Sequence, residues 1–173
     1  MQKTSTLPLP FLNDGVAQIG ILVKDLDRTI EMYWKVFGIG PWNIYTYGKP
    51  LVREMTYHGK PTSYHMRLGL ANLGHTRIEL IELGEGPTIY ADFVREHGYG
   101  IQHIGVLVDD MQSALQQAES AGLKMIQDGE GFGLDGDGHY AYLDTQDKFG
   151  VTIELIERPS KRVKPERVYP HKE

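Results

Sequence analysis

The clearest pattern in the chain is an apolar strand with a carboxylate in its middle, and it occurs twice. The first copy is TRIELIE at residues 76–82, and the second is VTIELIE at residues 151–157. A carboxylate inside an apolar strand is costly to bury unless another group pairs with it. Because Glu79 and Glu154 occupy the same place in both copies, the repeat favours a shared cation as their partner.

A second pair of strands precedes the acidic ones and is also repeated. Residues 16–26 (VAQIGILVKDL) align without a gap on residues 101–111 (IQHIGVLVDDM), which places Gln18 on His103. In the first copy the alternation puts Ile and Val on one face of the strand and Gln18 on the other. The chain therefore holds two copies of one module.

Each of these first strands is followed by a helical pattern with one apolar face. Asp25 and Asp110 are candidate N-caps, and Gly38 and Gly122 end the two patterns. The apolar positions are Leu26, Ile30, Tyr33, Trp34 and Phe37 in the first helix and Met111, Ala114, Leu115 and Ala118 in the second.

The repeated plan has three strands after the helix. In the second module they cover residues 123–127 and 140–143 and the acidic strand. The first module has about ten residues more in its middle. Strands are expected there over residues 45–47, 52–57 and 64–70, before the acidic strand.

These elements predict an α+β fold in which two tandem βαβββ modules form a curled mixed sheet. The helices cover its outer face, and its inner face is a metal-binding cup. The expected divisions are an N-terminal arm (1–15), a single domain (16–157) of two modules (16–83 and 100–157) joined by a short helix (88–98), and an extended basic tail (158–173).

Composition narrows the class of protein. A chain of 173 residues with 40% hydrophobic and 24% charged residues is typical of a soluble globular domain. The net charge of -5 argues against a general nucleic-acid binder. No apolar run approaches the ~18–20 residues of a membrane span, and the N-terminus lacks a signal-peptide core. The absence of cysteine excludes thiolate metal sites and fits a cytoplasmic location.

Four polar residues fall at matched positions of the two modules: Gln18, Glu79, His103 and Glu154. Modules related by a pseudo-twofold axis bring such positions together near the axis, and a glycine two residues after Gln18 and after His103 leaves room for a ligand. This set suits one divalent ion, such as Co, Mn, Ni, Zn or Mg, with positions open for water or substrate. The alternative interpretation is four hydrogen-bonded or solvated sheet residues, and the matched positions favour the metal site.

With these motifs the sequence resembles the vicinal oxygen chelate superfamily. This superfamily includes glyoxalase I, methylmalonyl-CoA epimerase, extradiol dioxygenases and antibiotic-resistance binding proteins. The resemblance covers roughly residues 16–157 and is carried by residues 16–26, residues 102–105 (QHIG) and the two IELIE strands. It implies that the four matched residues are the metal ligands. Residues 86–98, leading into QHI, look most like methylmalonyl-CoA epimerase.

The chain departs from those epimerases at several positions. The epimerases usually have His where this chain has Gln18, and its ligand set is instead similar to that of some glyoxalase I enzymes. Their glutamate base corresponds in a rough alignment to His65, with Glu54 as a second candidate. Extradiol dioxygenases need two His and one carboxylate on iron, and Gln18 argues against that activity. The enlarged span 42–73 brings extra tyrosines, so the substrate could differ from the familiar ones.

The resemblance implies proton abstraction next to a carbonyl group, with a metal-stabilised enolate. Glu154 would act as ligand and base, with His65 or Glu54 on the other face of the substrate. The expected function is a metal-dependent isomerase, epimerase or lyase similar to methylmalonyl-CoA epimerase. One alternative is a glyoxalase I-like lactoylglutathione lyase, and a second is a non-catalytic small-molecule binding protein of the same fold.

The expected partner is a small carbonyl compound, with a CoA thioester as one candidate. The protein is expected to be a homodimer without nucleic-acid or membrane partners. The role of two groups of residues stays open. The aromatic residues of the sheet either line an apolar pocket or are ordinary sheet residues. The cations of the tail either bind a phosphate group or are solvated. These residues are Trp42, Tyr45, Tyr47, Tyr57, Tyr140 and Tyr142, and Lys161, Arg162 and Lys164.

Overall fold

The computed structural model describes residues 8–171, so residues 1–7 of the expected arm and residues 172–173 of the tail lie outside the described part. An 11-stranded mixed sheet has the order β11-β2-β5-β6-β1-β7-β10-β9-β8-β3-β4. Its strands are β1 (Gln18–Val23), β2 (Trp42–Tyr47), β3 (Glu54–Tyr57), β4 (Lys60–Pro61), β5 (Met66–Leu73), β6 (Thr76–Leu83), β7 (Gly100–Leu107), β8 (Met125–Glu130), β9 (His139–Leu143), β10 (Thr152–Glu157) and β11 (Arg167–Tyr169). The helices are α1 (Leu26–Met32), α2 (Ile89–His97), α3 (Met111–Ser120) and α4 (Gln146–Phe149), with a 3-10 helix at Pro10–Asp14 and a π-helical turn at Tyr33–Phe37. Among residues 8–171, no helix has the length and apolar character needed to cross a membrane.

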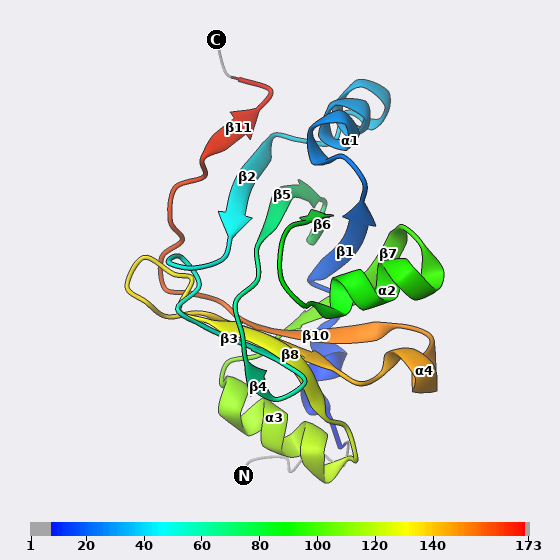
Figure 1. Cartoon of the computed structure of the whole chain (residues 1–173), viewed down its shortest axis with the longest axis vertical. Helices are drawn as coiled ribbons and strands as arrows, with labels where there is room; N and C mark the ends of the chain where they lie inside the picture. The colour runs from blue at the N-terminus through cyan, green and yellow to red at the C-terminus, as the bar shows by residue number, and fades with distance from the viewer. Residues whose placement is uncertain (1–7, 172–173) are drawn as a thin grey trace.

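The sheet consists of two halves that meet at β1 and β7. In each half the acidic strand lies beside the first strand and runs parallel to it, as β6 beside β1 and β10 beside β7. β1 and β7 pair antiparallel, with Ile19 directly opposite Ile104. These two residues are equivalent in the sequence repeat, so a pseudo-twofold axis passes between them. The sheet is curled, and the α+β fold is confirmed (Figure 1).

The two first helices cover the outer face of the sheet at opposite ends of the molecule (Figure 1). Leu26 and Ile30 of α1 pack over the first half, and Met111, Ala114 and Ala118 of α3 pack over the second. The predicted caps are confirmed, because the Asp25 and Asp110 side chains accept hydrogen bonds from backbone N–H groups three residues on.

The predicted apolar face of the first helix is wrong at its C-terminal end. The chain widens there into the π-helical turn, and the Phe37 side chain is 66% exposed. The wider turn breaks the 3.6-residue spacing on which the prediction rested, so Phe37 turns away from the sheet.

The concave face holds a third apolar core, in which tyrosine is the commonest aromatic residue. The buried hydroxyls pair with one another, as in Tyr90 Oη to Tyr142 Oη at 2.7 Å. The six aromatic residues named above therefore differ in their location. Trp42 packs under α1 on the outer face, and Tyr57 lies half-buried beside α2. The four that lie in the concave core are Tyr45, Tyr47, Tyr140 and Tyr142.

The extra residues of the first module form the hairpin β3–β4, which leaves its own half of the sheet. β3 pairs antiparallel with β8, at the far edge of the second half. The Thr56 hydroxyl also donates to Asp128 on β8. The hairpin thus ties the two halves together across the cup.

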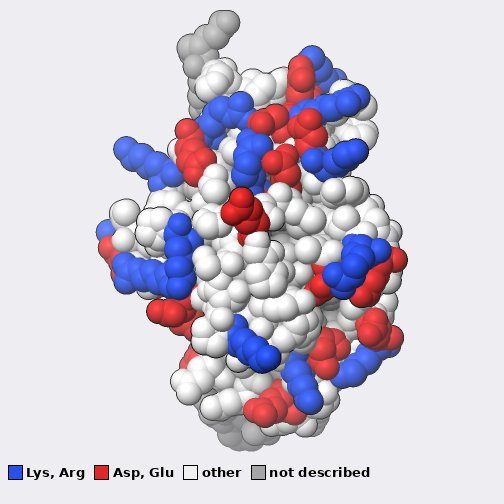
Figure 2. Space-filling model, in the orientation of Figure 1, with Lys and Arg blue, Asp and Glu red and all other residues white. Residues whose placement is uncertain are grey.

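The C-terminal segment makes a second connection between the halves, in the opposite direction. It leaves β10, follows the loop after β8, where Leu134 N donates to Lys161 O at 2.8 Å, and ends as β11 paired with β2. Arg167 forms an ion pair with Asp27 at the start of α1. In Figure 2 charged side chains of both signs gather at this end of the molecule and around the edges of a face whose centre carries few charges.

Candidate metal centre

The four predicted metal ligands lie together in the middle of the concave face. Glu79 on β6 is registered with Gly20, and Glu154 on β10 with Gly105, so both carboxylates flank the central strand pair. All four side chains are buried. Their exposures are 2% for Gln18, 8% for Glu79, 0% for His103 and 3% for Glu154.

Glu79, His103 and Glu154 form the centre of this cluster. One potential ligand atom of each lies within 4.8 Å of the others. His103 Nε2 is 3.3 Å from Glu79 Oε2 and 3.2 Å from Glu154 Oε2, yet within the described residues this buried nitrogen has no hydrogen-bond partner. Metal–ligand bonds of about 2.0–2.2 Å place ligand atoms at such mutual separations. The unpartnered nitrogen and the two converging oxygens therefore fit a divalent ion.

Gln102 orients the imidazole of His103. A bulge in the β1–β7 pairing leaves Gln102 without a partner on β1. Its Oε1 lies 2.7 Å from His103 Nδ1, and its Nε2 donates to Thr152 Oγ1 at 3.2 Å. An Nδ1–H donated to Gln102 leaves the lone pair of Nε2 directed at the carboxylates, as a metal-ligating histidine requires. Sequence reasoning missed this role because position 102 has no polar counterpart in the first module.

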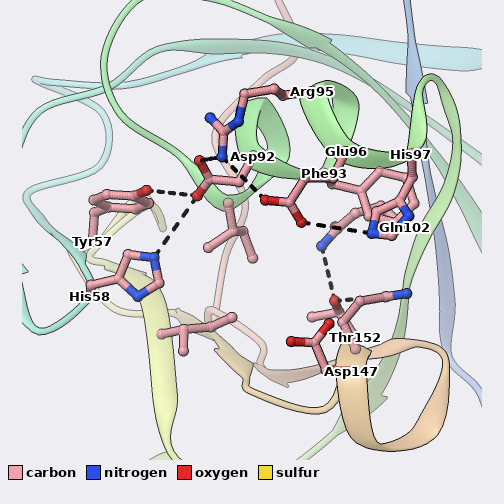
Figure 3. Close-up of a pocket in the computed structure, with 13 residues that line it drawn as sticks. Tyr57, His58, Asp92, Phe93, Arg95, Glu96, His97, Gln102, Asp147 and Thr152 are labelled. Carbon is pink, nitrogen blue, oxygen red and sulfur yellow. Dashed lines mark hydrogen bonds and ion pairs between the residues drawn. The ribbon is translucent and has the colours of Figure 1, made fainter.

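Gln102 and Thr152 also line a pocket of about 360 Å³ between α2, the β3–β4 hairpin and α4 (Figure 3). In the view Asp92 connects Tyr57 and His58 with Arg95. The bonds of the Gln102 amide to His103 and Thr152 separate this pocket from the carboxylates of the cluster.

The carboxylates determine the charge of His103 when no ion is bound. Burial by itself lowers the pKa of His103, but the adjacent Glu154 and Glu79 outweigh it and raise the pKa to about 9. An ion would take the place of the extra proton between the two carboxylates.

Two glycines make the close packing of this cluster possible. A Cβ atom at Gly20 would lie 1.9 Å from His103 Cε1, and one at Gly105 would lie 2.8 Å from Glu154 Oε2. No side chain fits at either position unless the cluster moves. Gly20 therefore provides space for His103 of the opposite module, and Gly105 provides space for Glu154 of its own module and for Gln18 of the other.

Gln18 lies at the cluster with its amide nitrogen facing the carboxylates. Its Nε2 donates to Glu79 Oε2 and Glu154 Oε2, both at 2.9 Å, and its Oε1 accepts from Arg77 Nε at 2.7 Å. An oxygen ligand would require the amide to turn over, which would place its NH₂ group against Arg77. In this arrangement Gln18 holds the two carboxylates in place, and the three-residue Glu–His–Glu set is the better defined ligand set.

The two residues predicted as acid–base partners, His65 and Glu54, do not lie at this cluster. Both are exposed. His65 lines a surface pocket with Lys49 and Glu166, and the β3–β4 hairpin places Glu54 beside Glu130 at the β8 edge. The rough alignment treated the enlarged span as part of the first half, whereas its hairpin belongs to the edge of the second.

The cavity at the cluster is small, about 20 Å³, which is room for one ion or one water molecule. Tyr47, Arg77 and Arg162 line it together with Glu79 and Glu154. Burial raises the pKa of Tyr47 to about 12, so this hydroxyl keeps its proton at neutral pH. Sequence reasoning did not assign these three residues to the site.

A curled sheet of two pseudo-symmetric halves, with a buried Glu–His–Glu cluster on its concave face, defines a class of α+β proteins with a cup-shaped site. Residues 17–143 match the family described as the Glyoxalase/Bleomycin resistance protein/Dioxygenase superfamily. The chain belongs to this superfamily, whose fold typically binds a divalent metal ion.

Solved structures of similar fold include methylmalonyl-CoA epimerases. The Mycobacterium tuberculosis enzyme is 24% identical, covers 84% of this chain and 88% of its own, and superposes with a TM-score of 0.59. A Streptomyces coelicolor variant in complex with 2-nitronate-propionyl-CoA is 19% identical over 86% of this chain and 96% of its own, with a TM-score of 0.59. A 76-residue segment is 32% identical to 4-hydroxyphenylpyruvate dioxygenase of Pseudomonas aeruginosa and spans 43% of this chain but only 21% of that enzyme. The two structural likenesses show a shared fold.

Proposed function

We propose that the protein is a divalent-metal-dependent enzyme that removes a proton next to a carbonyl group, as an epimerase of the methylmalonyl-CoA type does. The observation that supports this most is the convergence of His103 Nε2 and one carboxylate oxygen each of Glu79 and Glu154 in a buried cluster. The structural likeness to methylmalonyl-CoA epimerases adds support for this reaction over the glyoxalase I-like and non-catalytic alternatives.

Glu79, His103 and Glu154 would hold the ion, with Co, Mn, Ni, Zn and Mg as candidates for a set rich in oxygen. When bound, the ion would act as a Lewis acid that lowers the pKa of the adjacent C–H group and stabilises the enolate. Glu154 is the proposed base, since its carboxylate lines the cavity. Gln18 keeps both carboxylates in position through its NH₂ group. Tyr47 retains its proton and can donate a hydrogen bond to a substrate oxygen.

Solvent-deuterium exchange tests the reaction. Metal-loaded protein is incubated with methylmalonyl-CoA in D₂O, and incorporation at the carbon next to the thioester is followed by NMR or mass spectrometry. We expect incorporation by the natural sequence and a loss of at least about 100-fold in Glu154→Gln, the size of effect typical of a general base. A hemithioacetal of glutathione is tested in parallel. Exchange with that compound alone would favour the glyoxalase I-like alternative, and exchange with neither would contradict the proposal for both familiar substrates.

We also propose that the protein forms a homodimer in the cytoplasm. The end of α1 and the turn after it expose apolar side chains, with Val36 61% and Phe37 66% exposed. Exposed apolar groups that lie close together often mark protein–protein contacts. Sedimentation analysis measures the mass directly, and a monomer at micromolar concentration would contradict the dimer.

A further inference from the structure

We propose that Arg77 and Arg162 form an anion receptor beside the metal centre, and that it selects substrates with a carboxylate near the reacting carbonyl group. This inference rests on the proposed function, because both arginines line the cavity that holds Glu79 and Glu154. It names the two residues that would recognise a carboxylate such as the one that methylmalonyl-CoA carries on its reacting carbon.

The two arginines reach the same cavity from different parts of the chain. Arg77 lies on β6 two residues before Glu79, so its side chain emerges on the same concave face. Arg162 lies on the C-terminal segment where that segment forms an isolated bridge with Gly133. In the second module Thr152 occupies the position equivalent to Arg77, so the repeat supplies only one arginine. The C-terminal segment supplies the second guanidinium group.

These guanidinium groups have no carboxylate partner in the part of the chain that the structure describes. Arg67 is also only partly exposed, but it forms ion pairs with Asp27 and Glu82. Arg77 donates through Nε to Gln18, and Arg162 donates to Tyr47 Oη at 3.3 Å. A partly buried guanidinium has several N–H donors and a cost of desolvation, both of which favour a further acceptor.

The charges at the cavity also favour an anion. Arg77 and Arg162 line the same small cavity, so two like charges lie close together there. With a divalent ion bound, the two negative charges of Glu79 and Glu154 stand against two guanidinium groups and the two charges of the ion. A carboxylate would reduce this positive excess and could accept charge-assisted hydrogen bonds.

A substrate requires more space than about 20 Å³, and Arg162 is a long lining side chain that lies on the C-terminal segment, outside the central strands. Its side chain is held by the long hydrogen bond to Tyr47 and by a contact over the Phe132 ring at 5.9 Å. A cation–π contact at an accessible site is a weak interaction. The side chain can therefore swing out to admit a small organic acid and then return to bind its carboxylate.

The test uses two small probes that differ by one charge, malonate and its half-amide malonamate. Calorimetric titrations are done on the full chain, both metal-loaded and chelated, for the natural sequence and for Arg77→Gln, Arg162→Gln and Lys161→Gln. Lys161 is the matched control because it is an exposed cation next to Arg162. We expect the natural sequence to bind malonate about tenfold or more tightly than malonamate, as charge-assisted hydrogen bonds imply. Each arginine variant should lose most of this preference, whereas Lys161→Gln should keep it.

Two results would overturn the receptor: an unchanged preference for malonate in both arginine variants, or an equal loss of affinity for both probes. The metal content of every sample is measured separately. If the protein binds metal but shows no arginine-dependent preference, the receptor is contradicted and the proposed function is unaffected. An arginine-dependent preference in a protein that binds no metal would support the receptor and contradict the proposed function.

Discussion

The bond from His103 Nδ1 to Gln102 is a single contact that prepares the imidazole for an ion. Partners of this kind typically change metal affinity by about 10–100-fold when they are removed. We therefore expect Gln102→Leu to weaken metal binding by such a factor while the fold is kept. Gln116→Leu, on the exposed face of α3, is the control and should bind metal normally. Equal affinities in titrations of the two variants would show that Gln102 does not orient the ring.

Protonation of His103 predicts how the stability of the ion-free protein depends on pH. Its pKa is raised from 6.5 to about 9 by the two carboxylates. A group whose pKa is higher in the folded state contributes stability that is fully present below the unfolded value and is lost as the pH rises through the folded one. Chelated protein should therefore lose free energy of unfolding between pH 6.5 and about pH 9. Urea unfolding measures this, and the loss should be smaller in His103→Gln. Parallel pH profiles would refute the assignment.

The site residues that could be predicted from the sequence are those at positions that the repeat duplicates. Gln18 and His103 occupy matched positions, as do Glu79 and Glu154, and the structure brings all four together. Arg77 and Arg162 carried no such signal. The first has Thr152 as its counterpart, and the second lies outside both modules. A side chain that has no counterpart in the other module can be assigned to the site only when the three-dimensional structure is known.

At the scale of elements, Gly20 allows β1 and β7 to pair closely around the cluster. An added Cβ would lie 1.9 Å from the His103 ring, which cannot move without disturbing both carboxylates. We expect Gly20→Ala to lower the free energy of unfolding by about 1–3 kcal/mol, the range for overpacking, and to abolish metal binding.

Gly122→Ala supplies the comparison. Gly122 has a φ of 82° but no atom near its added Cβ, so only backbone strain of about 1 kcal/mol is expected and metal binding should persist. Denaturant unfolding and metal titration together separate the two effects. A Gly20→Ala protein that binds metal like the natural sequence would contradict the described packing.

Local patterns predicted the repeated elements well and the connecting ones poorly. The caps at Asp25 and Asp110 and the helix α3 follow from local chemistry, which is visible in the sequence. The pairing of β3 with β8 joins segments about 70 residues apart and depends on how the halves fold over one another. For that reason Glu54 was expected at the site and lies at a sheet edge instead.

At the scale of the whole molecule, the two halves form one cup that is tied together twice. The β3–β4 hairpin reaches from the first half to the second, and the C-terminal segment returns from the second to the first. The pseudo-twofold axis at Ile19 and Ile104 could be predicted from the repeat. The two connections lie outside the repeat, and the C-terminal one adds Arg162 to the lining of the small cavity at the cluster.

The proposed chemistry depends on one divalent ion per chain bound by the Glu79, His103 and Glu154 cluster. The most direct measurement is elemental analysis after chelation, reconstitution with Co²⁺ and removal of free metal, combined with a Co²⁺ titration. We expect one ion per chain in the natural sequence and loss of that ion in Glu79→Gln and Glu154→Gln. Binding no greater in the natural sequence than in the two variants would contradict it.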